Sequence, residues 1–248
     1  MIKFENISKS FGSKLVLQGV NLTVERGSSM VIIGGSGTGK SVLLKTVIGL
    51  MTPDSGRIFV DGQDIRKKNP SNFLKRFGML FQGGALFDSM PVWQNVAFRL
   101  QSGVLKQTNK HAREIAIEKL RRVGLSPDIA DQLPAELSGG MQKRVGLARA
   151  IAANPEIIFF DEPTTGLDPI MAGIINELIR EIVVETGVTA MTITHDMSSV
   201  DAIADTVAML HDGVIQWSGP KKNFRKCGDP FVNQFINGRA NGPIETLR

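Results

Sequence analysis

Two kinds of apolar pattern run along the chain, and they predict two kinds of strand. Apolar and polar residues alternate over residues 2–8, 15–24 and 56–62. This alternation is typical of strands with one buried face in an antiparallel sheet. Short, almost unbroken apolar runs occupy residues 28–33, 77–81, 157–160, 188–194 and 206–210. Such runs are typical of parallel strands whose two faces are both covered.

Helical patterns separate the unbroken runs. They occupy residues 40–50, 109–124, 169–184 and 198–204. The stretch 109–124 places its apolar residues on one face, as an amphipathic helix does. The stretch of about 85–153 is rich in helical pattern and has no strong strand. The sequence therefore predicts an α/β fold with a parallel-sheet core, an antiparallel β subdomain and a helical subdomain. We expect one domain over 1–227 and a C-terminal tail over 228–248.

Composition narrows the class of protein. The chain has 248 residues, of which 42% are hydrophobic and 21% charged, so it can build a core and is not wholly disordered. Its single cysteine, Cys227, excludes an intramolecular disulfide and a multi-cysteine zinc site. No apolar run approaches the ~18 residues that cross a bilayer, and the N-terminus lacks a signal-peptide pattern. We expect a soluble cytoplasmic protein, whose net charge of +5 permits contact with an anionic surface without requiring it.

A glycine-rich motif predicts a phosphate-binding loop. Residues 34–41 read GGSGTGKS, which matches GxxxxGK followed by Ser or Thr. The motif consists of Gly34, Gly35, Ser36, Gly37, Thr38, Gly39, Lys40 and Ser41. The glycines let backbone N–H groups point inward, and the following helix adds its positive end. Lys40 would bind the β- and γ-phosphates, and the Ser41 hydroxyl would bind Mg²⁺. A chance glycine-rich turn would not explain the strand before the motif and the helix after it.

Two carboxylates end the predicted strand 157–160. Asp161 and Glu162 would emerge at its carboxyl end, where parallel sheets bind ligands. Asp161 can hold the Mg²⁺ that Ser41 touches, and Glu162 can polarise a water for attack on the γ-phosphorus. Taken alone, the pair would be interpreted as solvated strand-end residues. A triphosphate site needs a metal carboxylate, which favours the functional interpretation.

A second anion-binding helix terminus is predicted about a hundred residues after the first. Residues 137–142 read LSGGMQ and precede a predicted helix over 143–153. Ser138 is a capping residue, and Gly139 and Gly140 leave backbone N–H groups uncovered. A simple helix cap is the alternative, but a Gly-Gly entry costs helix stability and a cap does not require it.

Two further polar residues follow predicted parallel strands. Gln82 ends the strand 77–81 and His195 ends the strand 188–194, so both would lie at the same edge as Asp161. The Gln82 amide would sense Mg²⁺ or the attacking water. In isolation, each would be interpreted as an ordinary surface residue.

Together these residues resemble the ATP-binding subunit of ABC transporters. From Phe4 to about Gly219 the motifs follow the family's order, with FFDEP at 159–163, Gly-Leu-Asp at 166–168 and Thr-His-Asp at 194–196. The resemblance implies a P-loop NTPase (RecA-like) core and ATPase activity. It also implies a head-to-tail homodimer with ATP and Mg²⁺ between each phosphate loop and the partner's Ser138–Gly140.

The same resemblance implies roles for three more side chains. His195 would contact the γ-phosphate, Asp168 would link the two sites, and Phe11 would stack on adenine. Phe replaces the more familiar Tyr at position 11, so core packing stays an alternative for it. Val42 and residues 141–144 also depart from the family's usual sequence. We expect neither departure to affect a residue with a chemical role.

A narrower resemblance concerns the transporter class. Residues 34–45, 81–98 and 238–243 are similar to Mla-type phospholipid-trafficking ATPases of Gram-negative bacteria. That implies a motor at the cytoplasmic face of the inner membrane, with a lipid permease and a small STAS-type accessory subunit as partners. The apolar side chains after Gln82 would line a groove for a permease helix or pack the helical insertion on the core. An ATPase of a polar-solute importer or drug exporter is the alternative function.

Other classes fit less well. A nucleic-acid-associated ABC ATPase would need a coiled-coil insertion, zinc-binding cysteines or a second cassette, so we expect no nucleic-acid partner. A nucleotide switch without turnover is disfavoured by Glu162. The basic cluster 221–226 would face anionic lipid or solvent. Apolar spacing over 231–236 predicts a short docking helix in the tail.

Overall fold

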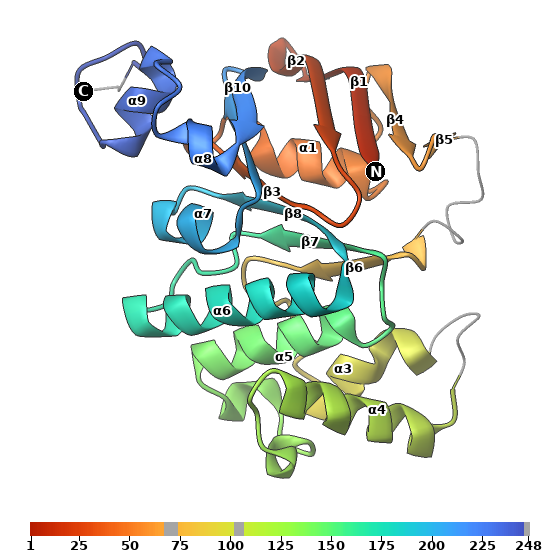
Figure 1. The fold of residues 1–248 in the computed structure, drawn as a ribbon. Coiled ribbons are helices and arrows are strands. Elements are labelled where there is room, and N and C mark those ends of the chain that lie inside the picture. Colours follow the sequence, from red (N-terminus) through yellow and green to blue (C-terminus); the bar gives the residue numbers. More distant parts are fainter. Residues whose placement is uncertain (67–73, 102–106, 246–248) are drawn as a thin grey trace. The chain divides into compact units, whose positions relative to one another are not determined.

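The computed structural model describes residues 1–66, 74–101 and 107–245 (Figure 1). The chain divides into two compact units. Unit 1 comprises Met1–Pro70 and Met191–Arg248, and unit 2 comprises Ser71–Ala190.

An antiparallel sheet in unit 1 is built from the alternating segments. It has the strand order β2-β1-β4-β5. The strands are β1 (Ile2–Phe11), β2 (Lys14–Val24), β4 (Ser55–Val60) and β5 (Gln63–Asp64). β1 pairs antiparallel with both β2 and β4. Ile2, Phe4 and Ile7 are buried along β1 while the residues between them are more exposed, which confirms the predicted antiparallel subdomain.

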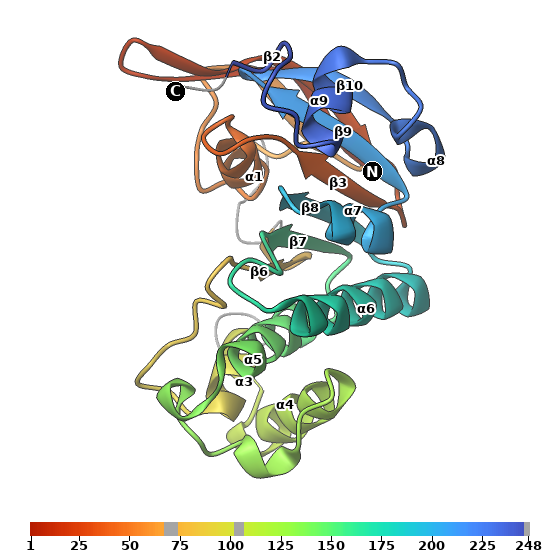
Figure 2. The same ribbon diagram turned by 90° about the vertical axis from the view of Figure 1, so that its left-hand side faces the viewer.

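Unit 1 also contains parallel pairing. Strand β3 (Ser29–Ile33) is buried throughout and pairs parallel with β9 (Thr206–His211). The edge strand β10 (Val214–Pro220) pairs antiparallel with β9 (Figure 2). In the part of unit 1 that the structure describes, the helices are α1 (Lys40–Val47), α7 (Met197–Ile203), α8 (Lys221–Phe224) and α9 (Pro230–Ile236). Strand β8 (Thr189–Thr194), also fully buried, spans the boundary between the units.

Unit 2 combines a parallel strand pair with helices. Strand β6 (Phe77–Leu80) pairs parallel with β7 (Ile157–Asp161). The helices of this unit among the described residues are α3 (Val92–Gln101), α4 (Asn109–Arg122), α5 (Gly139–Ile151) and α6 (Pro169–Thr186), with short 3₁₀ turns at Pro127–Ile129 and Pro134–Glu136. Figure 1 shows α5 with α6 along one side and α3 and α4 along the other. Eight of the thirteen α5 residues are buried, so α5 is the central helix of this unit.

Small residues bring α5 close to strand β6 and to the loop after it. A Cβ atom on Gly146 would lie 2.8 Å from Leu80 Cδ1 and 3.3 Å from the Gly84 carbonyl oxygen. A Cβ on Gly78 would lie 2.2 Å from the Ala150 carbonyl oxygen. Since larger side chains would push these segments apart, the glycines fix the distance between α5 and the loop.

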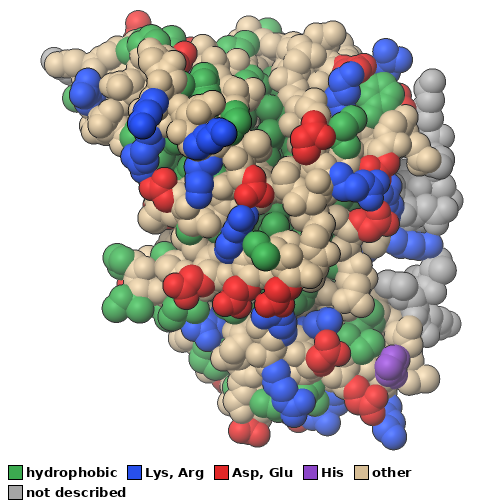
Figure 3. Space-filling view, in the orientation of Figure 1, with side chains coloured by type: hydrophobic (Ala, Val, Ile, Leu, Met, Phe, Trp, Pro, Cys, Tyr) green, Lys and Arg blue, Asp and Glu red, His purple; other side chains and the backbone are tan. Residues whose placement is uncertain are grey.

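Helix α6 shows how one helix separates its faces. Ile175, Ile179, Ile182 and Val183 are buried. Three glutamates at spacings of four residues, Glu177, Glu181 and Glu185, are exposed, and acidic side chains form a row over this helix in Figure 3. Arg122 at the end of α4 pairs with Glu181 at 3.6 Å and also with Glu185. The row is therefore partly neutralised within unit 2.

The C-terminal segment contains the short helix that the sequence predicted. In α9 the ring of Phe231 lies 5.1 Å from that of His211. Gln234 is only 5% exposed, and its side-chain amide holds the segment that follows. Its Nε2 donates to the carbonyls of Arg239 at 3.1 Å and Ile244 at 3.0 Å, and its Oε1 accepts from the Ile244 amide at 2.6 Å. One side chain thus closes a ten-residue loop.

Two helix boundaries differ from the prediction by three residues or more. Helix α1 ends at Val47 rather than at residue 50, and α5 begins at Gly139 rather than at residue 143. The α5 start moves because Ser138 caps the helix there and Gly140 is buried, so capping and packing outweigh the low helix propensity of glycine. Strand β10 was not predicted, because its residues are half-buried or exposed and show no clear alternation.

Candidate nucleotide-binding and hydrolysis site

The phosphate loop lies in unit 1, and its glycines are required by the backbone. Gly37 and Gly39 have φ values of 75° and 101°, which side-chain-bearing residues rarely adopt. A Cβ on Gly34 would lie 2.2 Å from the Leu210 carbonyl oxygen, and one on Gly39 would lie 2.9 Å from the Val16 carbonyl oxygen. Neither position can carry a side chain without moving a neighbouring strand.

Lys40 opens helix α1 and is bound to the loop before it. Lys40 is only 7% exposed. The Nζ atom donates to the carbonyls of Gly34 at 2.7 Å and Gly35 at 2.8 Å. The Thr38 hydroxyl also donates to the Gly35 carbonyl, at 3.0 Å. Ser41, the next residue, is exposed. A loop, a helix N-terminus and an ammonium group that converge in this way suit an anionic ligand.

A pocket of about 330 Å³ adjoins the phosphate loop. It is lined by Ser36, Gly37 and Thr38 of the loop and by Lys14, Leu15, Val16, Gln18, Asp212 and Gly213. Phe11, predicted to stack on adenine, does not line this pocket and is 48% exposed on β1. Core packing, the alternative for Phe11, is therefore wrong. The stacking role stays a prediction.

The acidic pair lies in unit 2, where strand β7 ends. Asp161 is the last residue of β7 and Glu162 follows it, both half-buried. Glu162 has φ 47°, in the left-handed region that is uncommon for residues other than glycine. Its Oε2 accepts a hydrogen bond from the Thr165 hydroxyl at 3.1 Å. Backbone strain of this kind concentrates at functional sites, and here it falls on the residue predicted to polarise water.

Lys143 of helix α5 brings Gln82 and Glu162 together. Its Nζ donates to the backbone carbonyl of Gln82 and to that of Glu162, the latter at 3.3 Å. Burial lowers the pKa of Lys143, and the carboxylates of Asp161 and Glu162 oppose that shift. Residues 141–144 are expected from the sequence to have no chemical role, and this contact of Lys143 is not predicted. The available signal was a lysine on the same buried helix face as Gly146, Leu147 and Ala150.

The terminus that the sequence predicts as a second anion-binding site is the first turn of α5. The Ser138 hydroxyl accepts a hydrogen bond from the Met141 amide at 3.3 Å, as predicted for a cap. Gly139 and Gly140 form the first turn itself rather than preceding the helix. A Cβ on Gly139 would meet no atom within 4 Å, whereas one on Gly140 would lie 2.6 Å from Met171 Cε. Gly139 therefore leaves open space beside the backbone of the turn.

Asp168 and His195 occupy different kinds of position. Asp168 caps α6, with Oδ1 accepting from the amides of Ile170 at 3.0 Å and Met171 at 3.1 Å. This local role was not predicted. His195, in unit 1, is exposed directly after β8. Its contact with the γ-phosphate stays a prediction.

Asp196, which follows His195, caps helix α7. Burial alone would raise the pKa of its carboxyl, but hydrogen bonds from the hydroxyls and amides of Ser198 and Ser199 outweigh burial and lower it. The carboxylate therefore stays charged and fixes the start of α7, immediately after the histidine.

These two units carry the parts of a P-loop nucleoside triphosphatase of the ATP-binding-cassette class. The phosphate loop, Phe11 and His195 lie in unit 1, and Gln82, Ser138–Gly140, Asp161, Glu162 and Asp168 lie in unit 2. A family model described as "ABC transporter" matches residues 17–165. The chain belongs to the ABC transporter family and is an ATP-binding subunit with ATPase activity. In the described ranges, no helix is both long enough and apolar enough to cross a membrane.

Solved structures agree with this assignment. The dimeric structure of the ATP-binding cassette MJ0796 in a post-hydrolysis state, bound to ADP and Pi, matches with a TM-score of 0.80 and 29% identity. The match covers 89% of this chain and 99% of that one. A second dimeric structure of MJ0796, described as a bacterial ABC transporter cassette, gives a TM-score of 0.82 at the same identity and coverage. The predicted fold class is confirmed.

Relatives with named functions align over almost the whole chain. A probable ribonucleotide transport ATP-binding protein, mkl of Mycobacterium tuberculosis, is 41% identical over 98% of this chain and 68% of the relative. The intermembrane phospholipid transport system ATP-binding protein MlaF of Escherichia coli is 40% identical over 98% of this chain and 91% of the relative. The chloroplastic protein TRIGALACTOSYLDIACYLGLYCEROL 3 of Arabidopsis thaliana is 37% identical over 98% and 75%.

Proposed function

We propose that this chain is the ATP-hydrolysing subunit of a transporter that moves phospholipid between the inner and outer membranes. The observation that carries the proposal is the match with MlaF proteins along nearly the full length of both chains. The Escherichia coli protein is covered to 91% and the Haemophilus influenzae protein, at 38% identity, to 93%. A polar-solute transporter is the second candidate, because the mkl relatives are named for ribonucleotide transport. Those proteins are longer, and this chain spans 68% of their length.

ATP would bind with its phosphates in the loop 34–41. The carbonyls of Gly34 and Gly35 hold the Lys40 ammonium at the loop, and a phosphate oxygen would take over part of that binding with a full negative charge. The backbone N–H groups and the helix α1 N-terminus add to the same attraction. The open pocket beside the loop leaves space for more of the nucleotide.

The donor set fits Mg²⁺. Mg²⁺ prefers hard oxygen ligands and takes several of them from water and nucleotide phosphates, so few protein oxygens are needed. Ser41 offers a hydroxyl, Asp161 a carboxylate and Gln82 an amide oxygen. When bound, the ion would neutralise charge that develops on the phosphates. We propose these three residues as its protein ligands.

Glu162 would polarise the attacking water, and His195 would contact the γ-phosphate. The hydrogen bond from Thr165 at 3.1 Å orients the Glu162 carboxylate, which has an unusual backbone conformation. A positioned base of this kind contributes roughly 10²–10⁴-fold to a rate. Glu162 is therefore the residue whose loss should separate binding of ATP from its hydrolysis.

Two copies of the chain would complete each ATP site. The exposed first turn of α5, with Ser138 and Gly139, would face the nucleotide held by the phosphate loop of the other copy. Asp168 would link the two sites, and Phe11 would contact adenine. The dimeric state of both MJ0796 structures supports this arrangement. ATP-driven closure of such a dimer would do the mechanical work on the transporter.

The permease would bind unit 2 near the loop after β6. Phe81 and Phe87 are 36% and 40% exposed there. The loop is nonetheless held firmly, since the buried Asn95 side chain accepts from the Phe87 amide at 2.7 Å and donates to the carbonyls of Phe87 at 3.1 Å and Met90 at 2.9 Å. Exposed aromatic residues on a fixed loop suit an inserted helix. The Phe87 ring also contacts Phe98 of α3 at a centroid distance of 4.6 Å, so this residue also packs within the helical part of unit 2. The permease contact stays a proposal.

The remaining partners follow from the same comparison. A permease in the inner membrane would place the chain on its cytoplasmic face, and a STAS-type subunit would bind the helices of unit 2. To test the cargo, the chain is purified with its membrane partner and the co-purifying small molecules are identified by mass spectrometry. Phospholipid held in stoichiometric amount supports the proposal. Ribonucleotide bound to the permease, with no retained phospholipid, would favour the second candidate.

A further inference from the structure

Two cations of helix α5, the buried Lys143 and the half-buried Arg149, hold the loop after β6 by its main chain. Lys143 donates to the Gln82 carbonyl. Arg149 donates to the carbonyls of Gly84 at 2.5 Å and Ala85 at 2.7 Å. All three acceptors are backbone atoms, so this clamp does not depend on the loop's side chains. Lys143 differs from Arg149 because its ammonium also reaches the carbonyl of Glu162, at 3.3 Å.

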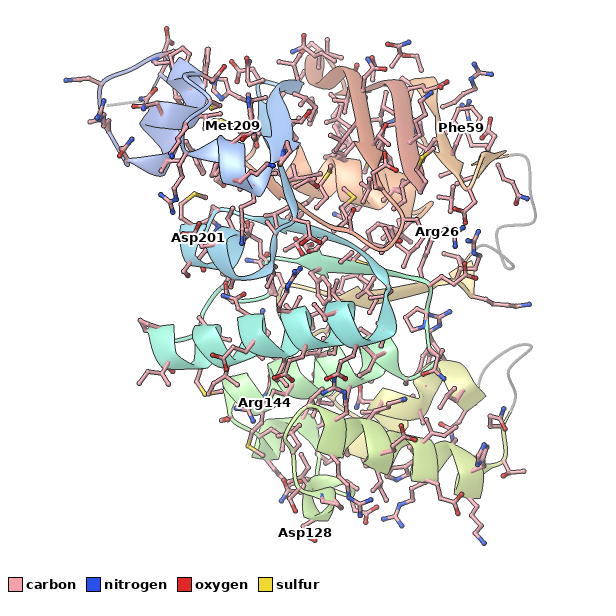
Figure 4. The ribbon with its side chains drawn as sticks, in the orientation of Figure 1. Arg26, Phe59, Asp128, Arg144, Asp201 and Met209 are labelled. Atoms are coloured by element: carbon pink, nitrogen blue, oxygen red, sulfur yellow. The ribbon has the colours of Figure 1, made fainter. Side chains whose placement is uncertain are left out.

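The neighbour of Lys143 has a different task. The side chain of Arg144, labelled in Figure 4, donates to the carbonyl of Gly124 at 3.3 Å. It therefore joins two helical segments, whereas Lys143 joins two segments that carry predicted site residues. Lys143 is only 5% exposed, and a buried ammonium group is tolerated only where acceptors or opposite charges surround it. The main-chain carbonyls and the nearby carboxylates of Asp161 and Glu162 supply both.

We propose that Lys143 is a positioning residue for hydrolysis, because one ammonium group fixes the main chain at Gln82 relative to the main chain at Glu162. The inference rests on the proposed roles of those two residues. Lys143 itself touches neither nucleotide nor water in this scheme. Glu162 has φ 47°, and a strained backbone keeps its conformation only where surrounding contacts hold it. The bond from Lys143 is such a contact.

A merely structural role makes a different prediction. If Lys143 only packed α5 onto β6, its loss would lower the stability of the fold and leave the turnover of folded protein unchanged. If it positions Glu162, its loss lowers kcat in protein that is fully folded. The KM for ATP would stay near its original value, because the phosphate loop and Lys40 belong to unit 1.

The decisive variant is Lys143→Met, which keeps the length of the side chain and removes its donors. In the full-length protein we expect kcat to fall ~10–100-fold, since displacing a catalytic group by about 1 Å costs ~10²-fold. The KM for ATP should change less than about twofold, as expected when ground-state binding is untouched. Lys143→Gln keeps amide donors without the charge, and should fall between Lys143→Met and the original protein in kcat.

Arg99→Met is the matched control. Arg99 also donates to backbone carbonyls in unit 2, those of Leu74 at 2.7 Å and Phe77, and burial lowers its pKa as it lowers that of Lys143. It contacts the start of β6 rather than Gln82 or Glu162. We expect Arg99→Met to lower the thermal unfolding temperature without lowering kcat measured well below that temperature.

Three outcomes overturn or redirect the inference. An unchanged kcat in folded Lys143→Met overturns it, and so does an equal loss of kcat in Arg99→Met. If Lys143→Met does not fold, an unchanged kcat in Lys143→Gln overturns it instead. Glu162→Gln, assayed in parallel, distinguishes a failure of the proposed role of Glu162 from a failure of the inference about Lys143. Near-normal turnover in that variant removes the proposed role of Glu162, whereas an inactive Glu162→Gln beside a fully active Lys143→Met removes only the role of Lys143.

Discussion

The phosphate loop of unit 1 and the loop after β6 in unit 2 are held in place by opposite means. In the phosphate loop the glycines themselves are required, because a Cβ on Gly34 or Gly39 would collide with a neighbouring backbone carbonyl. In the loop after β6, side chains from another element hold the backbone, through Lys143 and Arg149 of α5. The first loop is therefore visible as a motif in its own sequence. The second depends on residues about sixty positions away.

The difference has a consequence for function. A loop whose shape depends on glycines and a lysine within its own motif is fixed by its local sequence. This suits a site that must recognise the same phosphates each time. A loop held by a helix moves when that helix moves. Gln82 would then follow α5, whose first turn carries Ser138 and Gly139.

The largest effect should come from a variant that separates ATP binding from ATP hydrolysis. We propose binding for the phosphate loop of unit 1 and activation of water for Glu162 of unit 2. Glu162→Gln removes the base and keeps the shape of the side chain, so turnover should fall ~10³-fold. ATP binding should persist, because the phosphate loop is untouched, and the ATP-bound dimer should accumulate. Phosphate release, nucleotide binding and size-exclusion chromatography measure the three quantities. Turnover within a few-fold of the original would reject Glu162 as the base.

Removing the charge of Lys40 in the phosphate loop tests the proposed role of unit 1 in ATP binding. Lys40→Ala should weaken ATP binding itself ~10–100-fold, because charge-assisted bonds to phosphate are about twice as strong as neutral ones. Binding of a fluorescent nucleotide analogue gives the dissociation constant. Lys45→Ala is the control, since Lys45 is exposed in the last turn of the same helix. Equal losses in both variants would mean that general positive charge, rather than the position of Lys40, attracts the nucleotide.

The spacing between α5 and its loop can be tested through a glycine that the loop needs. Gly146→Ala would place a methyl group 2.8 Å from Leu80 Cδ1 and 3.3 Å from the backbone of Gly84. Such overpacking should lower the free energy of unfolding by about 1–3 kcal/mol. Gly173→Ala in α6, where a Cβ would meet no atom within 4 Å, should instead raise it by about 0.5–1 kcal/mol. Urea unfolding measures both, and a stabilising Gly146→Ala would contradict the close approach.

The smallest expected effect concerns the cap that follows His195. Asp196→Ala should cost about 1 kcal/mol of unfolding free energy at neutral pH, as loss of a helix cap does. Hydrogen bonds from Ser198 and Ser199 lower the pKa of the folded carboxyl despite its burial. Its contribution is therefore present above the unfolded pKa of ~3.9 and is lost as the pH falls through the lower folded value.

Urea unfolding at pH 7 and at pH 3 checks this dependence. The difference between the original protein and Asp196→Ala should shrink at the lower pH, since the carboxyl begins to protonate there. A difference that stays the same at both values would mean that the charge of Asp196 does not stabilise α7.

The sequence predicted the strands better than the ends of the helices. An unbroken apolar run such as 157–160 can only be buried on both sides, and β7 is buried over those residues. Helix ends depend on weaker forces. Glycines argued against a helix at 139–140, yet the Ser138 cap and the packing of Gly140 begin α5 there. β10 was missed because an edge strand with half-buried residues leaves no periodic pattern.

The residues of the candidate site also fall into two groups, those that the sequence predicts and those that it does not. The phosphate loop and the acidic pair were predicted because their chemistry requires particular residues in a fixed order. Lys143 was missed because its partners are main-chain carbonyls, which every residue possesses. Nothing in the sequence of the loop indicates which side chain will bind it. Only a charged residue on the apolar face of a helix gave a hint, and that requires the helix face to be known first.

The bond network of Gln234 makes it possible to separate release of the C-terminal segment from its deletion. Truncation removes the segment together with any surface it presents, so a lost activity has two explanations. Exchanging Gln234 for leucine would keep every later residue and remove the amide that joins Arg239 and Ile244 to α9. A spectroscopic probe on the single thiol, Cys227, would then be compared between the leucine variant and the truncated chain. The comparison would show whether releasing the C-terminal segment has the same effect as deleting it.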